Sequence, residues 1–134
     1  MEVLPVADRA FDVVIAHGIW NLARSSGHFR QAVREAARVC RPGAGLFLFT
    51  FSRNTLPAGA TPVPGETFVF TQFSGTPQCF LTENEIRKEF AACGFVRDPE
   101  GPLTEHNRAR PGDLRSGGGP VIYEGTFRFA PPRA

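Results

Sequence analysis

The stretch FDVVIAHGIWNLA, Phe11 to Ala23, decides the fold of this chain. Apolar side chains surround a single acid, Asp12, before the run breaks at His17-Gly18. A short run that is apolar on both sides is typical of a strand inside a parallel sheet, where both faces are covered. Such a strand normally has a neighbour on each side, so we expect further strands of the same sheet.

A helix and a second apolar strand follow. The spacing of apolar side chains after Ser25 predicts a helix that runs to about Arg41 and is stopped by Pro42-Gly43. In LFLFTF, residues 46–51, Leu and Phe side chains alternate, so both faces of this predicted strand are apolar. A strand, an amphipathic helix and another strand form a βαβ unit, whose crossover is expected to be right-handed.

The second half of the sequence predicts another helix and two more strands. Residues 52–80 are rich in Pro, Gly and Thr and are expected to form a long excursion at the carboxyl edge of the sheet, with a strand-like patch at 68–70. The motif LTENEI, residues 81–86, predicts a capping box and a hydrophobic staple at the start of a helix that ends at Gly94. One strand follows directly, and residues 121–129 alternate in the way that is typical of an antiparallel strand.

Composition limits the class of protein. The chain has 134 residues and a net charge of +2, which fits one α/β domain spanning residues 1–134. Three widely spaced cysteines, without a signal-peptide pattern, favour the reducing cytoplasm. The lack of CxxC or HxxxH spacing argues against a metal site. No apolar run approaches the ~18 residues of a membrane span, so no membrane association is expected.

Four segments match, in order, the pattern of one protein family. They are LPVADRAFDVVIAHGIW (4–20), FRQAVREAARVCRPGAGLFLFTF (29–51), FLTENEIRKEFAACGF (80–95) and PVIYEGTFRF (120–129). Together they resemble the carboxyl-terminal half of a class I S-adenosylmethionine-dependent methyltransferase. The first resembles the "LPF-x-D-x-x-FD" approach to the family's fourth strand, and the second resembles the "E-x-x-R-V-L-(K/R)-P-G-G" helix that leads into the fifth. The resemblance implies a Rossmann-like mixed α/β sheet running from the fourth strand to the seventh, with two helices between them. The last strand is antiparallel and inserted between the fifth and the sixth.

The resemblance also implies parts that this sequence lacks. The family's Gly-rich cofactor loop belongs to its first strand, and the only Gly cluster here, residues 117–119, instead precedes Pro120 and a strand. We therefore expect a partial domain whose first strand has an unpaired edge. Both crossovers run in the same direction, so both helices are expected on one face of the sheet, with the other face uncovered.

The uncovered surface has an energetic consequence. Leaving about six to eight large side chains uncovered forgoes on the order of 10 kcal/mol, at ~1.5–3 kcal/mol each. That is comparable to the stability of a whole domain. We therefore expect a longer chain, a second copy in a homodimer, or a partner subunit to cover the edge and the open face.

The candidate site follows from the sheet and from the resemblance. Ligands of open α/β sheets bind beyond the carboxyl ends of the strands, which places the turn after the first strand at the site. By resemblance, Ala16, His17 and Gly18 line the methionine end of the cofactor S-adenosylmethionine, and Trp20 and Asn21 face a small-molecule methyl acceptor. The implied function is methyl transfer. The alternative is a non-catalytic methyltransferase-like subunit that completes its sheet with a partner or a second copy.

Several residues have two interpretations. His17 is the best-placed candidate for a catalytic base, but we favour a strand-end residue hydrogen-bonded to backbone, because no partner is visible in the sequence. Trp20 is interpreted as a pocket wall or core residue rather than a catalytic group. Residues 52–54 either contact the acceptor or, as we favour, form a turn. The basic side chains of residues 106–115 are interpreted as solvated, so nucleic-acid binding is not expected.

Overall fold

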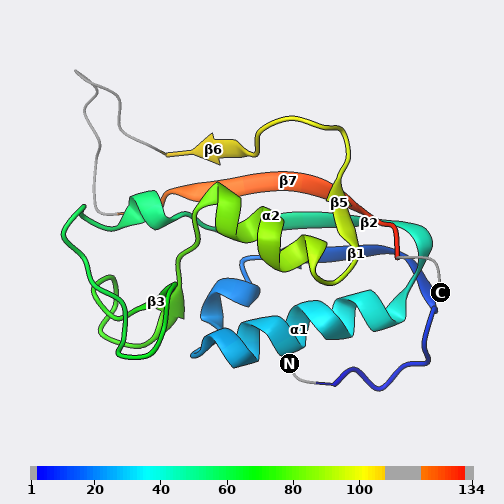
Figure 1. Ribbon diagram of the computed structural model, residues 1–134, viewed down its shortest axis with the longest axis horizontal. Coiled ribbons are helices and arrows are strands. Elements are labelled where there is room, and N and C mark those ends of the chain that lie inside the picture. Colours follow the sequence, from blue (N-terminus) through cyan, green and yellow to red (C-terminus); the bar gives the residue numbers. More distant parts are fainter. Residues whose placement is uncertain (1–2, 108–118, 132–134) are drawn as a thin grey trace.

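A five-stranded mixed sheet forms the centre of the protein in the computed structural model, which describes residues 3–107 and 119–131 (Figure 1). The strands are β1 (Phe11–His17), β2 (Cys40–Phe51), β5 (Phe95–Arg97), β6 (Thr104–His106) and β7 (Ile122–Phe129). Their order is β1-β2-β7-β5, with β6 paired to the other end of β7. β1 and β2 are parallel, and β7 lies antiparallel between β2 and β5. This confirms the predicted Rossmann-like mixed sheet with an antiparallel last strand.

Two helices and two single turns connect these strands. They are α1 (Ser26–Val39), α2 (Glu83–Ala91), η1 (Trp20–Leu22) and η2 (Arg53–Thr55). The side chain of Ser25 caps α1 by accepting a hydrogen bond from the His28 N–H at 3.1 Å. Thr82 and Glu85 form the predicted capping box of α2. Gly94 has φ +90°, the left-handed conformation expected after this helix.

The boundary between α1 and β2 differs from the prediction. The helix ends at Val39 and the strand begins at Cys40, so the helix-stop pair Pro42-Gly43 lies within the strand. Pairing with β1 explains this early start of the strand, because Phe11 of β1 pairs with Cys40. The register between the two strands then shifts between Phe11 and Val13. A proline has no N–H for a strand ladder and is tolerated at such an irregularity.

Residues 52–80 contain more structure than the sequence predicts. The strand-like patch forms β3 (Val69–Phe70), and it pairs with an unexpected partner strand, β4 (Gln78–Cys79). Aromatic rings pack this hairpin, with Phe80 stacked on Phe51 at 5.4 Å and in edge contact with Phe70 at 6.2 Å. Glu66 fastens the segment to the start of α1, where its carboxylate accepts hydrogen bonds from the Ser26 N–H and hydroxyl at 2.9 and 2.6 Å. A carboxylate at a helix amino terminus is also favoured by the helix dipole.

Both helices cover the same face of the sheet. Leu46 and Leu48 of β2 are 0% and 1% exposed and belong to one core with Phe29 of α1 and Phe90 of α2. Phe47, which points the other way, is 51% exposed. The structure thus confirms that the helices lie on one side, and it shows that the row of Phe side chains is on the uncovered side.

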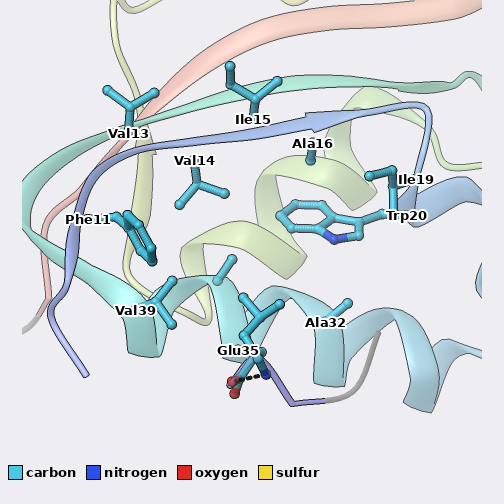
Figure 2. A pocket seen from close by; sticks show the side chains of 12 residues that line it. Phe11, Val13, Val14, Ile15, Ala16, Ile19, Trp20, Ala32, Glu35 and Val39 are labelled. Atoms are coloured by element: carbon cyan, nitrogen blue, oxygen red, sulfur yellow. Dashed lines mark hydrogen bonds between the residues drawn. The ribbon is translucent and has the colours of Figure 1, made fainter. Parts of the chain in front are cut away.

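We call the uncovered side the open face. It is formed by alternate residues that share a register across β1, β2 and β7: Val13, Ile15, His17, Phe47, Phe49, Glu124, Thr126 and Arg128. Val13 and Ile15 are 52% and 66% exposed, and in Figure 2 they point away from α1 while Val14 and Ala16 point toward it. Within residues 3–107 and 119–131, β1 is also the last strand of the sheet on its side, as expected from the sequence.

Residues 4–10 form an amino-terminal strap along α1. The Leu4 N–H donates to Glu35 at 2.7 Å, and Arg38 donates to the Leu4 carbonyl at 3.1 Å. Arg38 also pairs with Glu35 at 2.5 Å and with Asp8 at 2.6 Å. Glu35 is 6% exposed, so a nearly buried carboxylate holds the strap through one backbone donor and one guanidinium.

The strap predicts a pH dependence of stability. The hydrogen bonds from Arg38 and from the Leu4 N–H lower the pKa of Glu35 below its ordinary value of 4.5. Because the folded pKa is the lower one, this contribution is complete above the unfolded pKa and is lost as the pH falls through the folded pKa. We expect the urea midpoint of the wild-type chain to fall more steeply below pH 4.5 than that of Glu35→Gln. The exposed Glu100→Gln variant is the control, and parallel pH profiles for all three proteins would contradict this account.

Candidate functional site

The carboxyl ends of β1 and β2 meet at one edge of the sheet because the two strands are parallel. Gly18 follows β1 with φ +69°, a conformation that favours glycine. Its N–H donates to the Phe49 carbonyl at 2.7 Å, which ties the turn to β2. A Cβ atom placed on Gly18 would meet no atom within 4 Å, so there is space for another group to approach the backbone here.

The predicted site residues separate onto the two sides of the sheet. Ala16 is 3% exposed and points toward Trp20 on the helix side (Figure 2). Trp20 is 7% exposed, and its ring meets the rings of Phe90 and Phe29 edge-on at 5.7 and 6.4 Å. Asn21 follows in η1 and is 2% exposed. The structure therefore brings Ala16, Trp20 and Asn21 to the helix side, where Trp20 is a wall of the core.

His17 lies on the open face instead. Its side chain is exposed, and its ring stacks on Phe49 with centroids 4.5 Å apart and planes 14° apart. Phe49 in turn stacks on His106 at 6.2 Å, and His106 Nε2 lies 3.0 Å from a carboxylate oxygen of Glu124. Ring stacking therefore holds His17 on the open face, on the opposite side of the sheet from Trp20.

Two buried polar atoms at this edge have no hydrogen-bond partner among the described residues. They are Oδ1 of Asn21 and Oγ1 of Thr50, in residues that are 2% and 1% exposed. Thr50 follows Leu46 and Leu48 on the helix side of β2. Sequence reasoning did not single out Thr50, because nothing in the sequence shows that a strand hydroxyl lacks a partner.

Residues 52–54 form a turn, as favoured from the sequence. The Ser52 hydroxyl accepts from the Asn54 N–H at 3.0 Å and donates to Glu105 at 3.1 Å. The Asn54 side-chain amide donates to the same Glu105 oxygen at 2.6 Å. Burial raises the pKa of the neighbouring Tyr123, and a hydrogen bond with Ser52 opposes that rise. The sequence did not reveal Glu105 and Tyr123 as members of this network.

Arg53 holds the excursion in place. Its guanidinium donates to the Phe80 carbonyl at 2.7 Å and pairs with Glu85 at 2.5 Å. The same group lies over the ring of Phe70, 4.8 Å from its centroid. Arg53 is thus occupied by internal contacts, which supports its assignment as a structural residue. Of the basic residues in the range 106–115, only His106 is among those that the structure describes, and the others lie outside the described residues.

An apolar cavity of about 240 Å³ lies between β1 and α1 (Figure 2). Phe11, Val14 and Ile19 line one side, and Ala32 and Val39 line the other. Trp20, Glu35 and the strap residue Leu4 also line it. The cavity opens beside the exposed edge of β1, so apolar surface is uncovered there as well as on the open face.

The thiols and acids form no metal site in the part of the chain that the structure describes. No three His, Cys, Asp or Glu side chains gather there in a way that would hold a metal ion. All three cysteines are free, and burial raises the pKa of Cys79 to about 12. Neither α1 nor α2 is long and apolar enough to cross a bilayer.

Sequence comparison connects the site segment to known proteins. A family model described as "Methyltransferase domain" matches residues 1–49. A demethylmenaquinone methyltransferase of Corynebacterium urealyticum is 44% identical over 59 residues, which are 43% of this chain and 24% of the relative. The ubiquinone/menaquinone biosynthesis C-methyltransferase UbiE of Hahella chejuensis is 36% identical over 77 residues, covering 57% of this chain and 27% of the relative.

Solved structures share the fold over almost the whole chain. A SAM-dependent methyltransferase of Methanosarcina mazei superposes with a TM-score of 0.66 at 19% identity, covering 96% of this chain and 64% of that one. The chain therefore has the fold of S-adenosylmethionine-dependent methyltransferases, and its residues 1–49 match the methyltransferase-domain family model. A second solved structure, 1,6-didemethyltoxoflavin-N1-methyltransferase of Burkholderia thailandensis, superposes with a TM-score of 0.62 at 14% identity, covering 92% of this chain and 46% of that one. The chain spans about a quarter of the length of the curated relatives it matches.

Proposed function

We propose that the chain takes part in the transfer of a methyl group from S-adenosylmethionine to a small-molecule acceptor, as the carboxyl-terminal part of a methyltransferase domain. The parallel β1–β2 pair carries this proposal, because its carboxyl ends bring Ala16, Gly18, Trp20 and Asn21 to one edge. The matched methyltransferase segment, residues 1–49, contains these same four residues.

The residues at this edge fit one end of the cofactor. Ala16 and Gly18 are small, and the space above Gly18 allows close approach to the backbone. When bound, S-adenosylmethionine supplies a methyl group on a sulfonium, ready for in-line displacement. Among the residues that the structure describes, no Gly-rich loop joins a strand to a helix and could grip the rest of the cofactor. We propose that a segment other than these residues supplies that loop.

An aromatic acceptor suits the helix side of the edge. Trp20 lines the apolar cavity there with Val14 and Ile19, so a planar apolar molecule would meet an indole ring and aliphatic side chains. The curated relatives are named for demethylmenaquinone and for ubiquinone and menaquinone biosynthesis. We therefore propose a quinone-type aromatic acceptor. Holding it in line with the methyl group and excluding water are the catalytic contributions of this chain.

His17 is assigned no proton transfer in this proposal. Its ring stacks on Phe49 on the open face, whereas Trp20 and Asn21 lie on the helix side. This separation favours the strand-end interpretation of His17 over that of a catalytic base. We expect His17→Ala to change the methyl-transfer rate by much less than the ~10²–10⁴-fold loss that removal of a general base causes.

The exposed edge of β1 and the open face form the second part of the proposal. Parallel sheets are normally covered on both faces, whereas Val13, Ile15 and Phe47 are each at least half exposed here, at 52%, 66% and 51%. We propose that the remainder of a methyltransferase domain, a second copy or a partner subunit covers them. A non-catalytic subunit that completes its sheet in this way is the alternative function.

A fusion protein tests the proposed function. The amino-terminal portion of the C. urealyticum relative, up to its match with this chain, is placed before Met1, and transfer of labelled methyl to demethylmenaquinol is measured. We expect the fusion to transfer methyl groups and the unfused chain to show none. Gly18→Val in the fusion is the matched variant. It is expected to abolish transfer, because a β-branched side chain is strained at φ +69° and fills the space above the turn. A folded fusion that binds S-adenosylhomocysteine but transfers no methyl group to any quinol would favour the non-catalytic alternative.

A further inference from the structure

We propose that Asn21 and Thr50 form a buried binding site for one hydroxyl group at the carboxyl edge of the sheet. Asn21 Oδ1 and Thr50 Oγ1 are fully buried, and neither has a hydrogen-bond partner among the described residues. A buried polar atom without a partner costs free energy, so native proteins normally satisfy such atoms with a protein group, a water molecule or a ligand.

The fold places both residues at the same edge and on the same side. The Gly18 N–H bonds the Phe49 carbonyl at 2.7 Å, so the turn that leads into η1 starts beside Thr50. Thr50 belongs to the buried row of β2 with Leu48, and Asn21 follows Trp20, whose ring packs on α1 and α2. The two unsatisfied atoms therefore belong to the helix side of the carboxyl edge.

The chemistry of the two atoms selects a hydroxyl group. An amide oxygen accepts a hydrogen bond, and a threonine hydroxyl can donate one or accept one. An O–H group can donate one hydrogen bond to the amide oxygen of Asn21. It can also accept one from the hydroxyl of Thr50. A charged ligand does not fit, because neither Asn21 nor Thr50 carries a charge and both are buried.

The hydroxyl has two possible sources, a resident water molecule or an aromatic alcohol that enters as the methyl acceptor. A buried water typically makes about three hydrogen bonds to otherwise unsatisfied groups. An aromatic alcohol belongs to the acceptor class of the proposed function, and this second source rests on that proposal.

Thr50→Val tests the site, because it removes the hydroxyl at nearly constant volume. The urea midpoint of the ligand-free chain is compared with that of Thr55→Val, whose hydroxyl bonds the Val121 carbonyl at 3.0 Å and the Val121 N–H at 2.9 Å. For a resident water, we expect Thr50→Val to lower the midpoint as Thr55→Val does, and Thr50→Ser, which keeps the hydroxyl, to lower it less. These results would support a resident water molecule at the site.

Binding of a simple aromatic alcohol tests whether the hydroxyl group comes from an acceptor rather than from a resident water molecule. Calorimetric titration with 1-naphthol is compared with titration with 1-methoxynaphthalene, which lacks the O–H donor. For an acceptor hydroxyl, we expect Thr50→Val to leave the midpoint unchanged or raised, to weaken 1-naphthol binding at least tenfold, and to leave 1-methoxynaphthalene binding unchanged. An unchanged or raised midpoint without a selective loss of 1-naphthol binding would overturn the proposal. Neither measurement depends on methyl transfer, so these outcomes are distinct from failure of the proposed function.

Discussion

Replacing Phe90 by alanine is expected to lower the free energy of unfolding by about 3–5 kcal/mol. Phe90 is 0% exposed, and its ring lies 5.7 Å from Trp20 and 4.8 Å from Phe127. It therefore joins α2 to η1 and to β7 within one core. A loss of this size is a large part of the ~5–15 kcal/mol that stabilises a typical domain.

Urea denaturation followed by the fluorescence of Trp20, the only tryptophan of the chain, measures this loss. Phe73→Ala is the matched control, because Phe73 is 36% exposed and contacts the rings of Phe51 and Phe80 outside the main core. We expect the control to lose clearly less stability than Phe90→Ala. Equal losses would mean that α2 and η1 do not share a core with the sheet.

A double substitution of Ile15 and Phe47 by lysine is expected to prevent association through the open face. The two residues share a register across β1 and β2 and are 66% and 51% exposed. Burying each large side chain against a second copy or a partner contributes ~1.5–3 kcal/mol. The two substitutions together thus weaken association by roughly a hundredfold or more.

Sedimentation of the purified chain measures this effect. We expect the wild-type chain to sediment as a species larger than the monomer, and Ile15→Lys/Phe47→Lys to sediment as a folded monomer. Leu22→Lys is the control, since Leu22 is 57% exposed but lies in η1 rather than on the open face. A wild-type chain that stays monomeric at its highest soluble concentration would show that a second copy does not cover this face.

Local signals in the sequence predict most of the fold. The capping box at Thr82 and Glu85 and the glycine stop at Gly94 depend on side-chain and backbone chemistry within a few residues, and the structure confirms both. The alternation of residues 121–129 likewise predicts an antiparallel strand with a buried and an exposed side. In each case the information lies within one turn or one strand.

The sequence did not predict β6, and it misplaced the start of β2, because both depend on pairing with distant strands. β2 begins at Cys40, ahead of the helix-stop pair Pro42-Gly43, because Cys40 pairs with the distant Phe11. β6 exists because residues 104–106 pair with β7, although their sequence reads as a polar loop. No local rule contains these long-range partners, so propensity alone cannot predict them.

The candidate site likewise combines features that local sequence predicts with features that only tertiary packing determines. Its position at the carboxyl edge follows from the strand pattern and the direction of β1 and β2. The sides on which His17 and Trp20 lie depend on where the chain leaves the strand at Gly18 and on the rings that Trp20 meets. The unsatisfied hydroxyl of Thr50 appears only once the surrounding side chains are in place.

Calorimetric titration of the purified chain with S-adenosylhomocysteine, after sizing of the same sample by light scattering, tests the partial-domain account most directly. We predict no sub-micromolar binding and a species larger than the monomer, because in our proposal another segment supplies the cofactor-gripping loop and the apolar side chains of the open face favour association. Sub-micromolar binding to a monomer would contradict the account, since the residues between Ala16 and Asn21 would then suffice to hold the cofactor.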